Sequence, residues 1–488
     1  MVCDWVLNVG FRDLRDYISR LDKLGMLRVV EGAHWDLEIG AISQMMQESE
    51  ENPVLLFDKI PGYPAGFRVL ANHQNSPKKQ ALVLGLPTDL SLLEIVQQTK
   101  EKRRQTSLIP PKEVTGGPVL ENCARGNQVD LFKFPTPKWR TLEGGRYIGT
   151  STLVINRDPD EGWVNMGCYR QMIHDAKTVG YFVEPHHHGM IIAKKYWARG
   201  KPCPVVACYG QEEELFQAAT ASAPWGRSEF DVAGGLKGEP IETIKGELTG
   251  LPIPARAEIA IEGEVPPPEV DSRVEGPYRE WPGYYSQEPN PQPVIHIKAV
   301  YHRNDPIMTG PPASNRNISV GAVAHAAIAV WEALDRTALP GVRGVWAHAN
   351  GLFIVISLKQ EFAGHAKMAL LTATAARGSN SAYRYYVVVD EDIDPTNLND
   401  VLWAMTTRCV PEEQIDIVRA TVSTRVDPLI SPKKREIGDL TCGRVLINAC
   451  KPWDWIEQFG KSMTFTPEFY RQVNEKWGHL LTDKRGKQ

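Results

Sequence analysis

Between about residues 145 and 305 the chain is a succession of short β-type runs separated by Gly and Pro, and this texture restricts the fold more than any other feature. The runs are YIGTSTLVIN, WVNMGCYRQMI, HGMIIAKK, CPVVACYG, AEIAIEGEV and PVIHIKAVYHR. Closely spaced short strands with turn residues between them favour a barrel or a strongly bent sheet over βαβ repeats. We therefore expect a β-rich domain in the middle of the chain.

Both flanks of this region show mixed helical and extended patterns. The elements expected before it are helices within 11–24, 36–50 and 85–112, and a strand, turn and strand over 52–72. Those expected after it are helices at 320–334, 364–376 and 397–408 and strands within 342–359 and 383–394. Residues 307–317 read as a linker, and 467–488 as an amphipathic helix with a basic end. The region from 318 onward is therefore expected to be an α+β domain.

Composition and charge argue against several classes of protein. The chain has 488 residues and a formal net charge of −4, and its Lys and Arg are spread without a basic stripe for nucleic acid. No apolar run approaches the roughly 20 residues that span a bilayer, and the start lacks a secretory pattern. The eight cysteines form no CxxC pair, which indicates reduced thiols in a cytoplasmic protein. The motifs of the usual hydrolases, kinases and zinc enzymes are absent.

The stretch EGPYREWPGY places Glu275 and Glu280 on either side of a Gly-Pro turn. Pro277 excludes a regular helix interior there, so the chain must turn and can aim both carboxylates at one point. Arg170 lies in an uncharged β-type run, where a buried guanidinium needs a carboxylate or phosphate partner. The two glutamates are its obvious mates. An acid/base site and an ordinary structural ion pair both remain open on this pattern.

Two further stretches have the composition of a ligand site without its diagnostic spacing. His186, His187 and His188 are consecutive, and in an extended segment at most two of them share a face. They are candidate ligands or ordinary surface or core histidines. Glu229 lies in a Gly-rich stretch that lets the backbone approach a ligand, and residues 142–151 are similarly rich in glycine. Neither stretch fits the GxGxxG fingerprint or the P-loop.

Taken in order, VNMGCYRQMI, PHHHGM, WGRSEFDVAGGLKGEP and RVEGPYREWPGYY resemble the motifs of the UbiD family of decarboxylases. The resemblance extends through HANGLFIVISLKQEFAGHAK and VVVDEDIDPTNLNDVLWAMTTR and back to DLRDYISRLDKLGMLRVV, so it covers nearly the whole chain. It implies reversible, non-oxidative decarboxylation of an aromatic, heteroaromatic or α,β-unsaturated carboxylic acid through a covalent adduct with prenylated FMN. The implied partners are the acid, CO2 or bicarbonate, and a UbiX-type flavin prenyltransferase that supplies the cofactor.

The resemblance also implies a metal site that anchors the cofactor phosphate. The family's ligands are an Asn, a His and a Glu, which correspond here to Asn165, His188 and Glu229. The expected ions are Mn2+ or Mg2+, with K+ nearby. Oxygen ligands, one imidazole and a phosphate suit a hard divalent cation. Arg377 is the nearest cation to the position where some relatives place a phosphate-binding Lys.

The catalytic group implied by the resemblance is Arg170 with Glu275 and Glu280. Glu275 is expected to hold Arg170, and Glu280 to deliver a proton to the carbon that loses CO2. Such an acid needs a raised pKa, which a desolvated pocket provides. The residues expected to supply the apolar wall of that pocket are Trp281, Tyr284 and Tyr285. Further cofactor contacts are expected at Thr150, Cys168, Tyr169 and His187, the last at a position that is often Gln in the ferulic acid decarboxylases.

The expected fold is α+β and has four parts. They are an N-terminal α/β segment (1–120), a split β-barrel that binds the flavin (121–308), a C-terminal α+β domain for oligomerisation after a hinge (318–450), and a helical tail (451–488). The resemblance implies a homodimer or homohexamer. Two other functions remain open, namely a non-catalytic flavin-binding subunit of a carboxylase complex and an FMN oxidoreductase. The latter would bind plain FMN and oxidise NAD(P)H.

Overall fold

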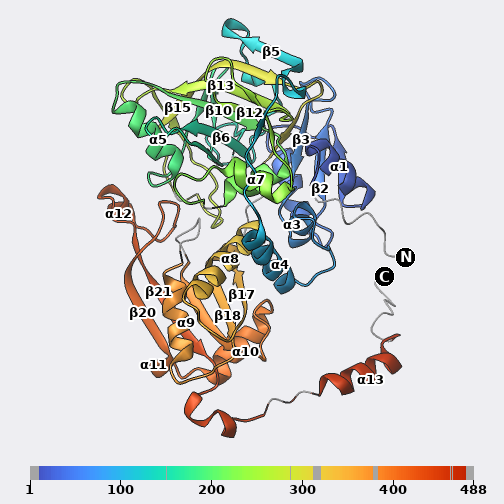
Figure 1. Cartoon of the computed structure of the whole chain (residues 1–488), viewed down its shortest axis with the longest axis vertical. Helices are drawn as coiled ribbons and strands as arrows, with labels where there is room; N and C mark the ends of the chain where they lie inside the picture. Colours follow the sequence, from blue (N-terminus) through green and yellow to red (C-terminus); the bar gives the residue numbers. More distant parts are fainter. Residues whose placement is uncertain are drawn as a thin grey trace.

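The computed structural model describes residues 10–149, 151–221, 223–285, 287–310, 320–376, 383–461, 463 and 465–479. It is a mixed α/β protein, and its described strands form sheets of four, nine, three and five strands. In Figure 1 the first three sheets form the upper part and the last sheet the lower part, with helices α4 and α8 between them. The C-terminal helix α13, Pro467–Trp477, extends away from the lower part (Figure 1).

The N-terminal sheet has the order β1-β2-β3-β16 and carries the first helices. Its strands are β1 Leu27–Glu31, β2 Val54–Asp58, β3 Arg68–Ala71 and β16 Ile307–Thr309, and its helices are α1 Leu14–Lys23, α2 Glu38–Gln47 and α3 Pro77–Val83. Helix α1 begins where Asp13 accepts a hydrogen bond from the amide of Asp16, and it buries Leu14, Ile18 and Leu21. The patterns within 11–24, 36–50 and 52–72 are thereby confirmed.

The linker expected at 307–317 is wrong for its first residues. Residues 307–309 form strand β16, which pairs in parallel with β3, and all three are buried. A three-residue strand has too short a pattern to be recognised, and only its distant partner makes it a strand. Residues 311–319 lie outside the described part of the chain.

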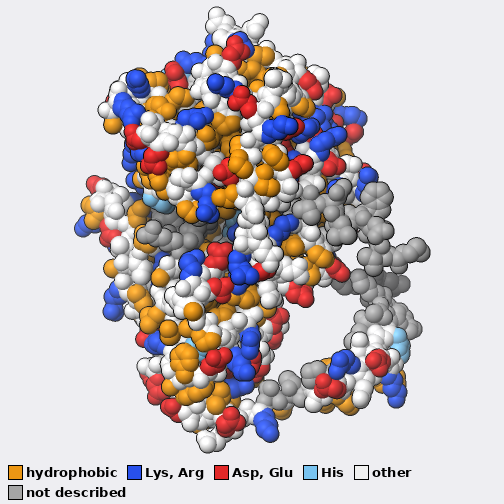
Figure 2. All heavy atoms as spheres, in the orientation of Figure 1, with side chains coloured by type: hydrophobic (Ala, Val, Ile, Leu, Met, Phe, Trp, Pro, Cys, Tyr) orange, Lys and Arg blue, Asp and Glu red, His pale blue; other side chains and the backbone are white. Residues whose placement is uncertain are grey.

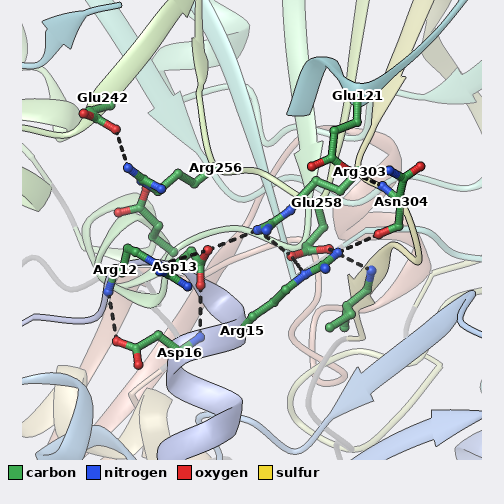
Figure 3. A network of polar contacts seen from close by, with 12 residues as sticks. Arg12, Asp13, Arg15, Asp16, Glu121, Glu242, Arg256, Glu258, Arg303 and Asn304 are labelled. Carbon is green, nitrogen blue, oxygen red and sulfur yellow. Dashed lines mark hydrogen bonds and ion pairs between the residues drawn. The ribbon is translucent and has the colours of Figure 1, made fainter. Parts of the chain in front are cut away.

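A buried ion network fixes α1 to the nine-stranded sheet (Figure 3). The Arg15 guanidinium binds both carboxylate oxygens of Glu258, at 2.9 and 2.8 Å. Arg303 bridges Glu258 and Asp13, at 3.1 and 3.2 Å. The Glu258 side chain is fully buried. Since two guanidinium groups satisfy this carboxylate, the start of the chain is held to residues more than 240 positions away in sequence.

The nine-stranded sheet has the order β7-β6-β10-β13-β15-β9-β8, with β14 and β5 also paired to β15. Every pairing within it is antiparallel. Its strands are β5 Asn122–Arg125, β6 Thr152–Arg157, β7 Val164–Gly167, β8 Ile173–Asp175, β9 Thr178–Gly180, β10 Cys203–Tyr209, β13 Ile259–Val265, β14 Ser272–Glu275 and β15 Asn290–His302. The texture of short strands is therefore confirmed, with one exception.

The run HGMIIAKK is a helix, so its prediction as a β-type run is wrong. Helix α5, His188–Trp197, buries Met190, Ile192 and Ala193. A short apolar run of this kind fits both periods, and packing against β6 and β7 decides for the helix. The other helices beside this sheet are α6 Glu213–Thr220 and α7 Glu229–Lys237. A three-stranded sheet of β4 Lys112–Glu113, β11 Glu242–Lys245 and β12 Pro252–Pro254 lies nearby.

The C-terminal sheet has the order β17-β18-β19-β21-β20. Its strands are β17 Val342–His348, β18 Phe353–Leu358, β19 Tyr385–Asp390, β20 Ile415–Val422 and β21 Thr441–Ala449. Its helices are α8 Val320–Arg336, α9 His365–Thr374, α10 Leu398–Arg408, α11 Pro411–Gln414 and α12 Pro432–Glu436. The elements expected from 320 to 408 are confirmed. Helix α4, Leu92–Gln105, also packs here and buries Val96 in the same core.

The surface agrees with the charge balance of the sequence. Figure 2 shows Lys and Arg intermingled with Asp and Glu over the visible face, without a broad area of one sign. Within the described residues, no helix has the length and apolar character needed to cross a membrane.

Short 3-10 helices in the described part lie at Pro118–Glu121, Gly126–Gln128, Leu131–Lys133, Ala349–Gly351 and Trp453–Gln458.

Candidate active site

Arg170 lies between two carboxylates, as the sequence predicts. Its Nη2 donates to Glu275 Oε2 at 2.7 Å, and its Nη1 donates to Glu280 Oε1 at 2.6 Å. Arg170 follows β7, Glu275 ends β14, and Glu280 lies in the loop that begins at the cis Gly276–Pro277 bond. All three side chains are buried. The turn therefore aims both carboxylates at one guanidinium, and the predicted pairing is confirmed.

Burial and charge act against each other in this trio. Burial disfavours the Arg170 charge, but the carboxylates of Glu280 and Glu275 outweigh it and raise the pKa of the guanidinium. Burial raises the pKa of Glu280, the Arg170 charge lowers it, and the negative charge of Glu275 adds to the rise. The net result is a Glu280 carboxyl whose pKa lies above its ordinary value. An acid of this kind can hold a proton closer to neutral pH.

Two aromatic rings cover the guanidinium. The Arg170 Cζ lies 3.7 Å from the centroid of Phe182 and 4.7 Å from that of Tyr278. The expected wall is wrong in two of its members, because Tyr284 is 61% exposed and Tyr285 36% exposed. Residues 281–284 form a turn, in which the Glu280 amide donates to the Tyr284 carbonyl at 2.9 Å.

The glutamate loop is held by close backbone contacts. The Gly144 amide donates to the Pro277 carbonyl at 3.0 Å. A Cβ added at Gly144 would lie 1.9 Å from the Gly276 carbonyl oxygen, so only glycine allows this approach. Beside it, Arg279 pairs with the buried Glu143 at 3.3 Å. The Gly-rich stretch 142–151 therefore supports the loop that carries Glu275 and Glu280.

The trio retains polar atoms without partners. Arg170 Nε and Glu275 Oε1 are buried and form no hydrogen bond with any described residue. Buried polar groups in folded proteins are almost always paired. Unpaired atoms beside the two carboxylates are therefore expected of a site whose hydrogen bonds are completed by a bound molecule.

A second cluster contains the residues predicted to bind metal. The backbone amide of Met166 donates to Glu229 Oε2 at 2.8 Å, which brings Glu229 next to Asn165. Asn165 Nδ2 donates to Asn156 Oδ1 at 3.0 Å, so the Asn165 Oδ1 is not used in this contact. Asn165 and Glu229 are both buried.

The backbone next to His188 contacts this cluster. The Gly189 amide donates to the Tyr169 hydroxyl at 3.1 Å, and Asn156 Nδ2 donates to the Gly189 carbonyl at 3.1 Å. The His188 ring lies edge-on to Trp163 and to Trp225, at centroid distances of 5.6 and 5.2 Å. Burial lowers its pKa, which favours the neutral imidazole that binds metals.

The chemistry of this donor set fits a bound divalent cation. No Lys or Arg of the described chain forms an ion pair with Glu229. Burial consequently raises the pKa of Glu229 to about 7. A buried carboxylate without a basic partner, an amide oxygen and a neutral imidazole are hard and borderline ligands that a cation would satisfy. In the described residues no three His, Cys, Asp or Glu side chains meet as a metal cluster, and the predicted set differs in containing Asn.

The remaining predicted cofactor contacts lie around the same strand. Tyr169 is buried, and its hydroxyl lies 3.4 Å from Asn165 Nδ2. Cys168 is partly buried, and burial raises the pKa of its thiol. His187 precedes α5, and burial, with the charges of His186 and His188, lowers its pKa to about 4. The predicted contacts Thr150 and Arg377 lie outside the described residues.

The residue after Thr150 belongs to a buried polar chain that the sequence gives no signal for. His73 Nε2 lies 2.7 Å from Ser151 Oγ, and His73 Nδ1 lies 2.8 Å from Glu213 Oε1. The Thr309 hydroxyl donates to the Ser151 carbonyl at 2.6 Å. These groups come from four segments far apart in sequence, and together they fix the start of β6.

Phe182 and Glu184 lie beside Arg170, and no motif in the sequence points to them.

The chain matches known proteins over most of its length. Three models of the UbiD family, described as 3-octaprenyl-4-hydroxybenzoate carboxy-lyase, match in succession. They are its N-terminal domain over residues 18–99, its Rift-related domain over 112–314 and its C-terminal domain over 320–449. Together they span most of the described chain.

Individual relatives match along nearly their whole length. Pyrrole-2-carboxylic acid decarboxylase from Pseudomonas aeruginosa is 30% identical, covering 96% of this chain and 98% of the relative. The UbiD-class enzyme HmfF from Pelotomaculum thermopropionicum in complex with FMN has 27% identity and a TM-score of 0.83, covering 96% of this chain and all of the other. An evolved dimeric form of HmfF in complex with prenylated FMN has 25% identity and a TM-score of 0.79, covering 95% and 99%.

Proposed function

Because this chain belongs to the UbiD family of carboxy-lyases, we propose that it reversibly decarboxylates an aromatic, heteroaromatic or α,β-unsaturated carboxylic acid with prenylated FMN as cofactor. The observation that carries the proposal is the buried Arg170 held by Glu275 and Glu280, with the pKa of Glu280 raised by burial. Prenylated FMN, when bound, supplies the electron sink that loss of CO2 requires. Binding of this cofactor by a similar protein supports the choice.

The three residues of the trio have distinct roles in this proposal. Arg170 attracts and orients the substrate carboxylate through its guanidinium. Glu275 holds Arg170 at 2.7 Å and is a positioning residue. Glu280 holds a proton on its carboxyl and delivers it to the carbon that has lost CO2. Phe182 and Tyr278 cover the guanidinium and limit the access of water to it.

The residues predicted to bind the metal would hold the cofactor by its phosphate. Asn165, His188 and Glu229 supply the protein ligands of Mn2+ or Mg2+, and K+ binds nearby. The buried Glu229, which forms no ion pair with a Lys or Arg of the described residues, supports this assignment. Cys168, Tyr169 and His187 would line the flavin in this proposal. Thr150 and Arg377, outside the described residues, stay predicted contacts of the flavin and of its phosphate. The nine-stranded sheet would be the split β-barrel that carries these groups, and the C-terminal sheet follows it in the chain.

Several partners belong to the same proposal. They are the acid, CO2 or bicarbonate, and a UbiX-type prenyltransferase as the source of the cofactor. The chain forms a homodimer or homohexamer. Exposed Phe469, Tyr470 and Trp477 on helix α13 support assembly, because such apolar side chains need a covering surface. Light scattering of the purified protein measures the state directly.

The proposal is tested by co-expression with a flavin prenyltransferase. Native mass spectrometry should show prenylated FMN and a divalent metal on the chain, and the loaded protein should release CO2 from at least one acid of an aromatic panel. Bound cofactor without CO2 release from any acid would indicate a non-catalytic subunit. Plain FMN with NAD(P)H oxidation would indicate an oxidoreductase.

A further inference from the structure

Glu184 is a carboxyl group beside the catalytic trio that the proposed chemistry does not use. It lies two residues beyond Phe182, whose backbone amide donates to the Arg170 carbonyl at 3.2 Å and whose ring covers the Arg170 guanidinium. The backbone bridge between Arg170 and Phe182 therefore brings the segment that carries Glu184 to the trio.

The Glu184 carboxyl is desolvated and incompletely paired. Its Oε1 is buried and has no hydrogen-bond partner among the described residues, and none of their basic groups forms an ion pair with it. Burial raises the pKa of Glu184, against the attraction of the Arg425, His186 and Arg170 charges. Burial raises the pKa of Glu280 most, and the charges of Glu275 and Glu184 add to this rise. Glu184 therefore lies within electrostatic range of both Arg170 and Glu280.

We infer that Glu184 determines specificity by accepting a hydrogen bond from an N–H or O–H group on the ring of the substrate. This inference rests on the proposed function and narrows its substrate class to aromatic acids that carry a ring donor. A buried acceptor left without a donor costs free energy, so a ring that offers only an acceptor is disfavoured. The matching chemistry is that of a pyrrole-type N–H or a phenolic hydroxyl.

Arg425 is the basic group that could pair with Glu184 in place of a donor on the substrate. It comes from the C-terminal part of the chain and is exposed. It attracts the Glu184 carboxylate electrostatically but forms no ion pair with it. A carboxylate that is paired with Arg425 in the working enzyme would not discriminate between ring donors. The experiment must therefore compare substrates that differ in the donor alone.

Pyrrole-2-carboxylate and furan-2-carboxylate form such a pair, because they have one shape and differ by N–H against O. 4-Hydroxybenzoate and benzoate form a second pair. Affinities for the FMN-loaded protein are measured by calorimetry, which requires no turnover. In at least one pair, the wild type should bind the acid with the ring N–H or O–H about tenfold or more tightly than the acid without it. Glu184→Leu should bring that ratio close to one, and the isosteric Glu184→Gln to an intermediate value. The exposed Glu269→Gln is the matched control and should keep the wild-type ratio.

A wild-type ratio near one in both pairs, a preference for furan, or a ratio unchanged in Glu184→Leu overturns the inference. CO2 release by the enzyme loaded with prenylated FMN is recorded in parallel on the same acids. Release without donor preference leaves the proposed function intact and removes the role of Glu184. Donor preference in binding without CO2 release from any acid keeps the role of Glu184 and removes the proposed function.

Discussion

Replacing Glu275 by Gln separates the positioning role from the proton-donor role. In the wild type, Arg170 Nη2 donates to Glu275 Oε2 at 2.7 Å. Glu275→Gln keeps the shape of the side chain and an oxygen that can accept this hydrogen bond. The lost quantity is the difference between a charged and a neutral acceptor, about 1–2 kcal/mol of unfolding free energy. When Glu280 is ionised, the net charge of one guanidinium and two carboxylates changes from −1 to 0, which limits this loss.

The larger effect falls on Glu280. The two carboxylates bind neighbouring nitrogens of one guanidinium, so their charges lie roughly 5 Å apart. At an effective dielectric constant of about 20, this repulsion is on the order of 3 kcal/mol, and it adds to the rise in the pKa of Glu280. Glu275→Gln removes the repulsion and leaves Arg170 to Glu280 alone, so the pKa of Glu280 falls. Since the donor must be protonated, activity should then be lost at a lower pH.

The assay is the pH dependence of kcat/KM for CO2 release, which reports the ionisations of the free enzyme. The alkaline limb of Glu275→Gln should lie at lower pH than that of the wild type, because the pKa of Glu280 falls when the charge of Glu275 is removed. Denaturant unfolding gives the stability change, and the exposed Glu288→Gln should alter neither quantity. An alkaline limb that stays in place or moves upward would refute the coupling of Glu275 to Glu280.

Three further perturbations have defined outcomes. His188→Ala should lose metal and flavin together by more than about tenfold, measured by elemental analysis and absorbance, whereas the exposed His186→Ala should keep both. Glu214 is buried, and burial, with the charge of Glu212, raises its pKa to about 7, so its contribution to stability is complete below pH 4.5 and lost as the pH rises through 7. Between pH 4.5 and pH 7, Glu214→Gln should therefore lose about 3 kcal/mol less unfolding free energy than the wild type, as measured by thermal unfolding. Gly144→Ala should destabilise by about 1–3 kcal/mol and reduce activity strongly through the shifted loop, but Gly116→Ala, with open space around it, should not; equal effects would contradict the close contact.

The sequence predicts best where one local rule decides the structure. Helical spacing decides α1 and α8, and alternating short runs decide most strands of the nine-stranded sheet. The Arg170 pairing follows from the cost of burying an unpaired guanidinium, which limits its partners to nearby acids. These rules require no knowledge of the tertiary structure.

The sequence fails where a distant partner decides. HGMIIAKK fits both the helical and the extended period, and the strands beneath it select the helix. Phe182 and Glu184 carry no motif, and they matter only because a backbone bridge brings their segment to Arg170. Tyr284 and Tyr285 follow Glu280 in the sequence but turn away from it, since neighbours along a loop need not share its interior.

Strand β16 has a consequence for how the protein is made. The first sheet needs residues 307–309 to cover the edge of β3, and Arg303 and Glu258 to secure α1. During synthesis these residues leave the ribosome long after the strands that they complete. The amino-terminal part of the nascent chain must therefore wait with an open sheet edge, the kind of surface to which chaperones bind and at which misassembly begins. A chain truncated before residue 307 would keep this edge open permanently.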